Sequence, residues 1–265
     1  MLLDLAADSR QTVPADLPDY IRQHDIVRAA LRVAKEVDAT DEEWKAFMEM
    51  LQNRQNYGGI FLSVPTYRLD AIETIGRKIL QEYDPVLLDG PPQAVPIETI
   101  IETKFDLTLE YHCLRKNGSI LGETIFDEGA AILYDQDEKR YRLIAVKAGT
   151  ILVEERLCVD RLLGRLRFTC AHELGHWVLQ QKLYSGTGDV AAYEGKTSLD
   201  ESHGLVEWQA DALATALLMP LPQIKRSFYR LRAGRSNEQL VAEMAQIFQV
   251  SKQAMRIRLE TRNLI

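Results

Sequence analysis

Arg167 to Gln180 reads R-F-T-C-A-H-E-L-G-H-W-V-L-Q and contains the motif H-E-x-x-H, formed by His172, Glu173 and His176. Two histidines four residues apart lie on one face of an α-helix, one turn from each other, so their imidazoles can bind the same zinc ion. Glu173 lies beside that face, where a carboxylate can accept the proton of a metal-bound water. The stretch therefore predicts a zinc site on a helix.

The residues around the motif favour a helix that is partly buried. Apolar side chains recur at helical spacing without an interrupting proline, at Ala171, Leu174, Trp177 and Val178. Gly175 lowers helix propensity, but it leaves room for another element to approach closely. The alternative is a chance motif on a core helix. That alternative would bury two histidines and a glutamate without partners, which is unfavourable.

A second helix is predicted downstream, where Gly204 to Pro220 reads G-L-V-E-W-Q-A-D-A-L-A-T-A-L-L-M-P. A hydrolytic zinc site normally has three protein ligands and one open position. Glu207 is the best candidate for the third ligand, because it is an acid in a largely apolar helix. Asp211 shares its face and can hydrogen-bond the outer nitrogen of a zinc-bound histidine. The alternative for both acids is an exposed helix face.

An oxyanion formed during hydrolysis also needs a hydrogen-bond donor. Tyr184, Tyr193 and His203 lie between the two helices and are candidates for this role. Each of them taken alone is better explained as a surface residue of a loop.

The whole chain has an ordinary globular composition, with 46% hydrophobic and 27% charged residues among 265. The three cysteines, Cys113, Cys158 and Cys170, are scattered, which excludes a disulfide framework or a C-x-x-C zinc site. The N-terminus has no basic region typical of a signal peptide. The longest uncharged apolar run, 212–221, is too short to span a bilayer. We therefore expect a soluble, cytoplasmic protein without a membrane partner.

The fold class predicted from the patterning is α+β, mainly helical, with a small antiparallel sheet packed beside the motif helix. Strands are expected over 107–113, 130–134 and 140–147, and helices over 20–37, 41–51, 67–83 and from about 160. Three parts follow: an N-terminal helical extension over 1–66, a catalytic domain over 67–230, and a helical pair over 231–265.

The C-terminal part is basic although the chain carries a net charge of −7. Between Leu221 and Ile265 there are nine Lys or Arg and three Glu, a local charge of +6. Ser236 opens a helix with a capping box, and a second helix is expected over 252–261. The pair resembles a helix-turn-helix, so DNA binding through this tail is one alternative. Packing of its apolar residues on the body is favoured.

The two helices together carry a family resemblance. R-F-T-C-A-H-E-L-G-H followed by V-E-W-Q-A-D-A-L-A-T-A-L-L-M-P is similar to the ImmA/IrrE family of zinc metallopeptidases, over roughly residues 71–220. The resemblance implies His172, His176 and Glu207 as ligands of Zn2+ and Glu173 as the catalytic acid and base. Asp211 takes the position where the family usually has Asn or Asp. Cys170, Leu213 and Gln180 replace the common Leu, Phe and His.

The resemblance also implies a substrate class, because members are similar to proteases that cut a partner helix-turn-helix repressor. The sequence therefore predicts a zinc endopeptidase with a protein substrate that regulates transcription. The alternative is a regulatory or DNA-binding protein whose metal site is structural. Glu173 favours the enzyme, because a structural site has no use for a general base.

Overall fold

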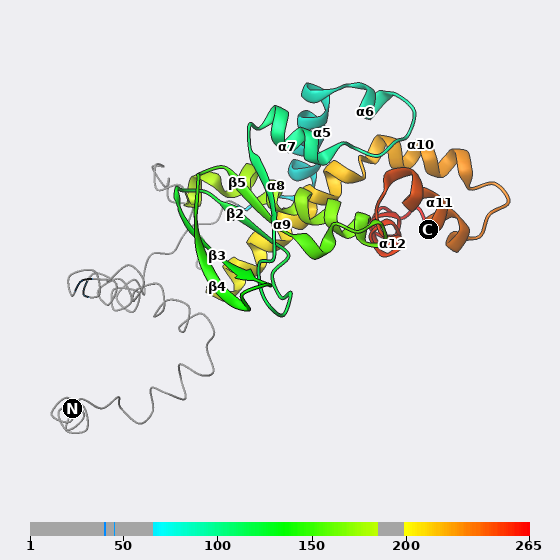
Figure 1. The fold of residues 1–265 in the computed structure, drawn as a ribbon. Helices are drawn as coiled ribbons and strands as arrows, with labels where there is room; N and C mark the ends of the chain where they lie inside the picture. Colours follow the sequence, from blue (N-terminus) through cyan, green and yellow to red (C-terminus); the bar gives the residue numbers. More distant parts are fainter. Residues whose placement is uncertain (1–39, 41–44, 46–65, 185–198) are drawn as a thin grey trace. The chain divides into compact units, whose positions relative to one another are not determined.

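The structure is a computed structural model that describes residues 66–184 and 199–265, together with positions 40 and 45 (Figure 1). Of the helices expected over 20–37 and 41–51, only Lys45 falls among the described residues. Residues 134–144 group apart from 66–133, 145–184 and 199–265, so they are described by themselves. The predicted division into parts at 66 and 230 remains a prediction.

The elements follow one another as α5 (Leu69–Tyr83), α6 (Val86–Asp89), α7 (Ile97–Lys104), β1 (Thr108–His112), β2 (Gly122–Ile125), β3 (Gly129–Asp135), β4 (Arg140–Val146), β5 (Thr150–Glu154), the 3-10 turns η1 (Glu155–Leu157) and η2 (Asp160–Leu162), α8 (Leu163–Tyr184), α9 (Leu199–Leu218), α10 (Leu221–Leu231), α11 (Asn237–Phe248) and α12 (Lys252–Thr261). This is the mainly helical α+β class that the patterning predicts.

The strands form two small sheets. One has the order β1-β5-β2, and the other is the hairpin of β3 and β4. β2 runs antiparallel to β5, with Thr124 opposite Ile151, whereas β1 runs parallel to β5, with Glu110 opposite Leu152. The parallel pair departs from the expected antiparallel arrangement. It arises because the chain passes through β2 and the hairpin before it returns to β1, and parallel neighbours need such a long connection.

The central strand β5 was missed by the sequence patterning. All five of its residues are buried, so it has no alternation of apolar and polar side chains. A short, continuously apolar run cannot be separated from a buried helix by periodicity. β2 was also missed, because it is only four residues long and begins with glycine.

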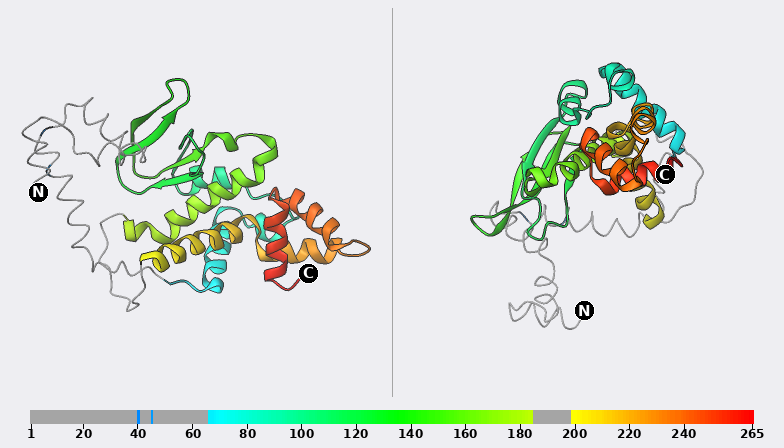
Figure 2. Two further views of the ribbon diagram at one scale, coloured as in Figure 1. Left: turned by 90° about the horizontal axis from the view of Figure 1, so that it is seen from below. Right: turned by 90° about the vertical axis from the view of Figure 1, so that its right-hand side faces the viewer.

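The motif helix α8 lies between the three-stranded sheet and α9 (Figure 2). Its buried side chains include Cys170, Ala171 and Leu174. A β-carbon on Gly175 would lie 2.9 Å from Cα of Ala210, so the two helix backbones approach closely there. Gly175 therefore has the expected packing role, because it leaves room for another helix to approach closely.

The C-terminal helices share the core of the body, as favoured from the sequence. Leu240, Phe248 and Met255 belong to the same buried cluster as Leu174 and Leu217. Ser236 forms the predicted capping box at the start of α11, and Ser251 caps α12. None of the helices within the described ranges combines the length and the apolarity needed to cross a membrane.

Candidate metal centre

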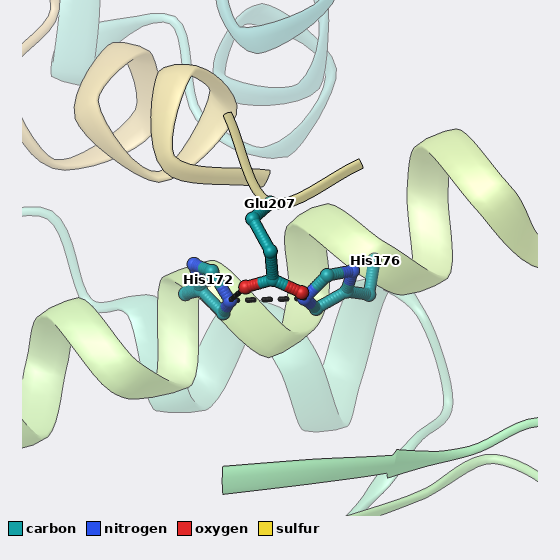
Figure 3. A group of neighbouring side chains, drawn as sticks. All are labelled: His172, His176 and Glu207. Carbon is teal, nitrogen blue, oxygen red and sulfur yellow. Dashed lines mark hydrogen bonds and ion pairs between the residues drawn. The ribbon is translucent and has the colours of Figure 1, made fainter. Parts of the chain in front are cut away.

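Three side chains from α8 and α9 converge on one point. Nε2 of His172 and Nε2 of His176 lie 2.9 Å apart. The Glu207 carboxylate lies across from them, with Oε2 at 3.3 Å from Nε2 of His172 and Oε1 at 3.6 Å from Nε2 of His176 (Figure 3). One ligand atom from each of the three lies within 4.8 Å of the other two. The group is thus the set of donors that the sequence singled out.

The outer nitrogens of both imidazoles are held by hydrogen bonds. Nδ1 of His172 lies 2.9 Å from Oδ1 of Asp211, and Nδ1 of His176 lies 2.7 Å from Oε1 of Gln180. A carboxylate only accepts hydrogen bonds. The amide of Gln180 donates through Nε2 to the carbonyl of Val206, which leaves its oxygen facing His176. Both Nδ1 atoms therefore carry a hydrogen, which leaves both Nε2 atoms as the nitrogens that can bind a metal ion.

This donor set fits a metal ion. The lone pairs of two Nε2 atoms and a carboxylate repel one another when they face the same point. A cation at that point would be attracted to all three groups and would remove the repulsion. Tetrahedral zinc with metal–ligand distances of about 2.0–2.1 Å puts its ligand atoms about 3.3 Å apart. The two Nε2 atoms, 2.9 Å apart, and the nearer carboxylate oxygen of each imidazole, at 3.3 and 3.6 Å, lie close to that spacing, although the two oxygens differ. Two nitrogen donors and one oxygen donor are also the ligand types of hydrolytic zinc sites.

The local field favours positive charge. Burial lowers the pKa of His172, but its hydrogen bond to Asp211 and the negative charges of Glu173, Asp211 and Glu207 outweigh burial, so the pKa of His172 is raised. Burial and the charge of His172 lower the pKa of His176. The point between the two rings thus stabilises one positive charge in the protein alone, and a divalent cation would use the same carboxylates.

Glu173 lies next to this group but faces the sheet. Its side chain is 6% exposed, and burial raises the pKa of its carboxyl group to about 7, although the hydrogen bond from Thr124 and the charge of His172 act in the opposite direction. Oγ1 of Thr124 lies 2.7 Å from Oε2 of Glu173. A carboxyl group with a pKa near neutrality can both accept and return a proton at physiological pH.

Strand β2 supplies residues that the sequence patterning did not identify. Thr124 lies 3.0 Å from the backbone carbonyl of Glu173 as well as close to its carboxylate. A β-carbon on Gly122 would overlap with the same carboxylate. A larger residue at this position of the strand would therefore have to displace the Glu173 side chain. No motif marks either residue, because their role depends on the pairing of β2 with β5 over α8.

An open pocket of about 650 Å³ contains the group. Apolar walls surround the polar residues of the centre, and they are formed by Ile120, Leu121, Phe126, Phe168 and Val206. Phe126 stacks on Trp177 with ring centroids 5.7 Å apart. The pocket is large enough for part of a peptide, since ligand pockets commonly measure about 300–1,000 Å³.

The remaining candidates have different outcomes. Asp211 takes the expected position against His172. Tyr193 lies outside the described residues, and so do the side chains of Tyr184 and His203, so the oxyanion donors remain predictions. Cys170 is fully buried, and burial raises the pKa of its thiol, which fits the expected small apolar role.

Comparisons with known proteins agree with the motif. Residues 135–260 match the model of the IrrE N-terminal-like domain, in the peptidase family M78. Among solved structures, a Mycobacterium tuberculosis transcriptional regulator matches with 15% identity and a TM-score of 0.44. The match covers 73% of this chain and 47% of that one, so this chain spans about half of its length. No curated protein sequence matches significantly.

Proposed function

We propose that this chain, in which residues 135–260 match the model of the IrrE N-terminal-like domain, is a zinc-dependent endopeptidase that cleaves a helix-turn-helix transcriptional repressor. The observation that carries the proposal is the convergence of His172, His176 and Glu207 beside the buried carboxyl group of Glu173. The family match supports a peptidase. The proposal also rests on the geometry, because a metallopeptidase needs metal ligands beside a general base, and three possible ligands lie here beside a buried carboxyl group.

His172, His176 and Glu207 would hold the metal ion, and Asp211 and Gln180 would keep both imidazoles in the tautomer that presents Nε2. The bound ion would act as a Lewis acid towards the scissile carbonyl and the attacking water. Zinc is proposed because it suits two imidazoles and a carboxylate with one position open for solvent.

Glu173 would move the protons of the reaction. Its carboxylate accepts a proton from the attacking water and later donates it to the leaving amine. The pKa near 7 keeps both protonation states accessible. Thr124 donates to Oε2 and fixes the rotation of the carboxyl group, so that the base is oriented before substrate arrives.

An extended peptide fits the surroundings of the centre. β2 is at one end of the sheet order β1-β5-β2, and within the described part of the chain it pairs only with β5. Its residues Gly122 and Thr124 line the pocket. A strand edge can bind a peptide backbone as an added strand, and the apolar walls can take its side chains.

The repressor as substrate follows from the resemblance of this chain to peptidases that cut such proteins. The test is co-expression of the chain with a helix-turn-helix repressor encoded beside its gene, followed by detection of repressor fragments. Cleavage should disappear in Glu173→Gln while the zinc content of the purified protein stays at one ion per chain. Glu102→Gln, at an exposed carboxylate on α7, is the matched control and should cleave normally.

The second candidate function is a regulator that does not cleave, with a structural metal site. It would be supported by full zinc occupancy together with an intact repressor in both the wild-type protein and Glu173→Gln. Loss of cleavage together with loss of zinc in Glu173→Gln would instead show that Glu173 helps to bind the metal, which contradicts the role proposed for it.

A further inference from the structure

The exposed side of α10 and the turn after it form a basic surface, which begins on the helix that follows α9. It consists of Lys225, Arg226, Arg230, Arg232 and Arg235, all of which are exposed. The sequence from Met219 to Asn237 contains no Asp or Glu, although the whole chain has a net charge of −7. We call these five residues the α10 basic surface.

Among the side chains that the structure describes, most of this charge has no acidic partner. Arg235 pairs with Glu243 at 2.7 Å, and Arg226 donates to the backbone carbonyls of Asp89 and Gly90, which leaves its charge uncompensated. Lys225, Arg230 and Arg232 have no carboxylate within ion-pair distance among residues 66–180 and 204–265, whose side chains the structure describes.

Acidic residues of α5 and α6 lie beside the end of the surface where α10 begins. Asp70 and Glu73 of α5 line a pocket together with Lys225. Glu73 is already bound by the guanidinium groups of Arg258 and Arg262. Arg230 and Arg232 do not line this pocket, and near the α10–α11 turn Arg235 is the one cation of the surface that a described acid pairs with.

Helix α12 does not offer a comparable surface. Arg258 is 2% exposed and donates to the carbonyl of Met219 and to Glu73, and Arg262 binds the same carboxylate. Of the three basic residues in α12 and Arg262 at its C-cap, Lys252 and Arg256 have no such contacts with the described residues. The basic signal of the tail, which the sequence associated with a helix-turn-helix, therefore lies on α10 rather than on the second helix of that pair.

An exposed aromatic ring stands among the cations. Tyr229 is 61% exposed, the most exposed large apolar side chain in the described part of the chain. The guanidinium of Arg232 lies 5.7 Å from its ring centroid and 5.8 Å from that of Phe228. An arginine held over an aromatic ring keeps its hydrogen-bond donors directed outwards, and the free face of Tyr229 can stack on a flat group.

We infer that the α10 basic surface binds the sugar-phosphate backbone of a nucleic acid. Four of its five cations are arginines, whose planar forks match phosphate oxygens. A nucleic acid is favoured over an acidic protein because it offers evenly spaced phosphates, one for about each 3.4 Å along a strand, to successive cations on the helix. Tyr229 additionally suits stacking on an unpaired base.

The dimensions suit a short contact. From Lys225 to Arg232 the helix rises about 10 Å, enough for roughly two to four phosphates. The surface is also separate from the metal centre, because Glu207 and the end of α9 at Leu218 are about 16 Å apart along the helix axis. Binding of a nucleic acid would therefore leave the pocket accessible.

The test measures binding of the full chain to a labelled duplex of mixed sequence, to its single strand and to poly-glutamate, over a series of salt concentrations. The double variant Arg230→Gln/Arg232→Gln is compared with Lys252→Gln/Arg256→Gln, which removes the same charge from α12. We expect the first variant to reduce the slope of log affinity against log salt by about 1.8, at about 0.9 per phosphate contact. The α12 variant should bind like the wild-type protein.

Tyr229→Ala separates the two possible sources of phosphate. If Tyr229→Ala weakens binding to the single strand alone, the ligand is an unpaired strand. If it changes the affinity for strand and duplex equally, the ligand is the sugar-phosphate backbone of either. The inference is overturned if the wild-type chain shows no salt-dependent binding. It is also overturned if both double variants lose affinity equally, or if poly-glutamate binds as tightly as the nucleic acids.

Discussion

Gly175 and Ala210 bring the backbones of α8 and α9 into near contact, since a β-carbon on Gly175 would lie 2.9 Å from both Cα and O of Ala210. His176 is the next residue on α8, and Asp211 is the next residue on α9. The close approach therefore sets how far Glu207 and Asp211 reach towards the imidazoles. Packing of the two helices and assembly of the metal centre depend on the same contact.

Gly175→Ala should destabilise the protein by about 1–3 kcal/mol, because the added methyl group has to separate two packed helices. The sign of this change in stability is informative, because replacing glycine by alanine inside a helix normally stabilises it by about 0.5–1 kcal/mol. Gly204→Ala is the control, because its β-carbon would meet nothing within 4 Å. Chemical denaturation measures both. A Gly175→Ala protein as stable as Gly204→Ala would contradict the close approach.

Asp211→Ala should weaken zinc binding by about 10–100-fold, because Nδ1 of His172 loses the acceptor that fixes its tautomer. Competition with a chromogenic chelator measures the affinity. Asp127→Ala removes an exposed carboxylate near the pocket and controls for the change of charge. If the two variants bind zinc with equal affinity, the hydrogen bond between Asp211 and His172 contributes nothing to zinc binding beyond the negative charge of Asp211.

Thr124→Val should reduce the rate of peptide cleavage by about tenfold, the equivalent of about 1.4 kcal/mol, because Glu173 loses a hydrogen bond to its charged form. That hydrogen bond lowers the pKa of Glu173, so its loss should raise the pKa and move the acidic limb of the pH–rate profile to higher pH. Thr124→Ser keeps the hydroxyl and should restore both properties. A profile that does not move would exclude this role for Thr124.

Glu73→Gln should destabilise the protein by about 3–5 kcal/mol near neutral pH, because it leaves the buried guanidinium of Arg258 without its counter-charge. Burial raises the pKa of Glu73, but hydrogen bonds and charges of Arg258 and Arg262 outweigh it, and the net pKa is lowered. The stabilisation is therefore present above the ordinary pKa of a glutamate and is lost as pH falls through the lowered value.

Unfolding in urea at a series of pH values tests this linkage. The difference between wild-type protein and Glu73→Gln should shrink as the solution becomes acidic. Glu82→Gln, which removes an exposed partner of Lys104, should change little at any pH. A difference that stays constant down to strongly acidic pH would show that Glu73 does not act through its charge.

Local patterns sufficed where the physical cause lies within a few residues. The spacing of His172 and His176 places both rings on one helix face, and the capping box at Ser236 starts α11 as predicted. The apolar run around Ala210 identified α9 as a buried helix, with Glu207 and Asp211 on one face. For these elements the helical repeat alone relates sequence position to direction in space.

The failures share a different cause. Neither β2 nor β5 has a distinctive local pattern, because β5 is buried throughout and β2 is short. Gly122 and Thr124 have their roles because strand β2 lies against the motif helix. Thr124 is 49 residues away from Glu173 in the sequence. Likewise, Arg258 and Arg262 read as a basic surface until α5 supplies Glu73 from 185 and 189 residues away.

The amino-acid sequence by itself determined the motif helix, its partner α9 and the chemical identity of the candidate ligands, because helical periodicity and side-chain chemistry are local properties. Only the tertiary structure decided that Glu173 lies under β2 and that Thr124 holds it. It also decided that the free positive charge of the C-terminal region lies on α10. Contacts between distant segments bury some charges and pair others, and no short-range pattern records which of them remain exposed to solvent.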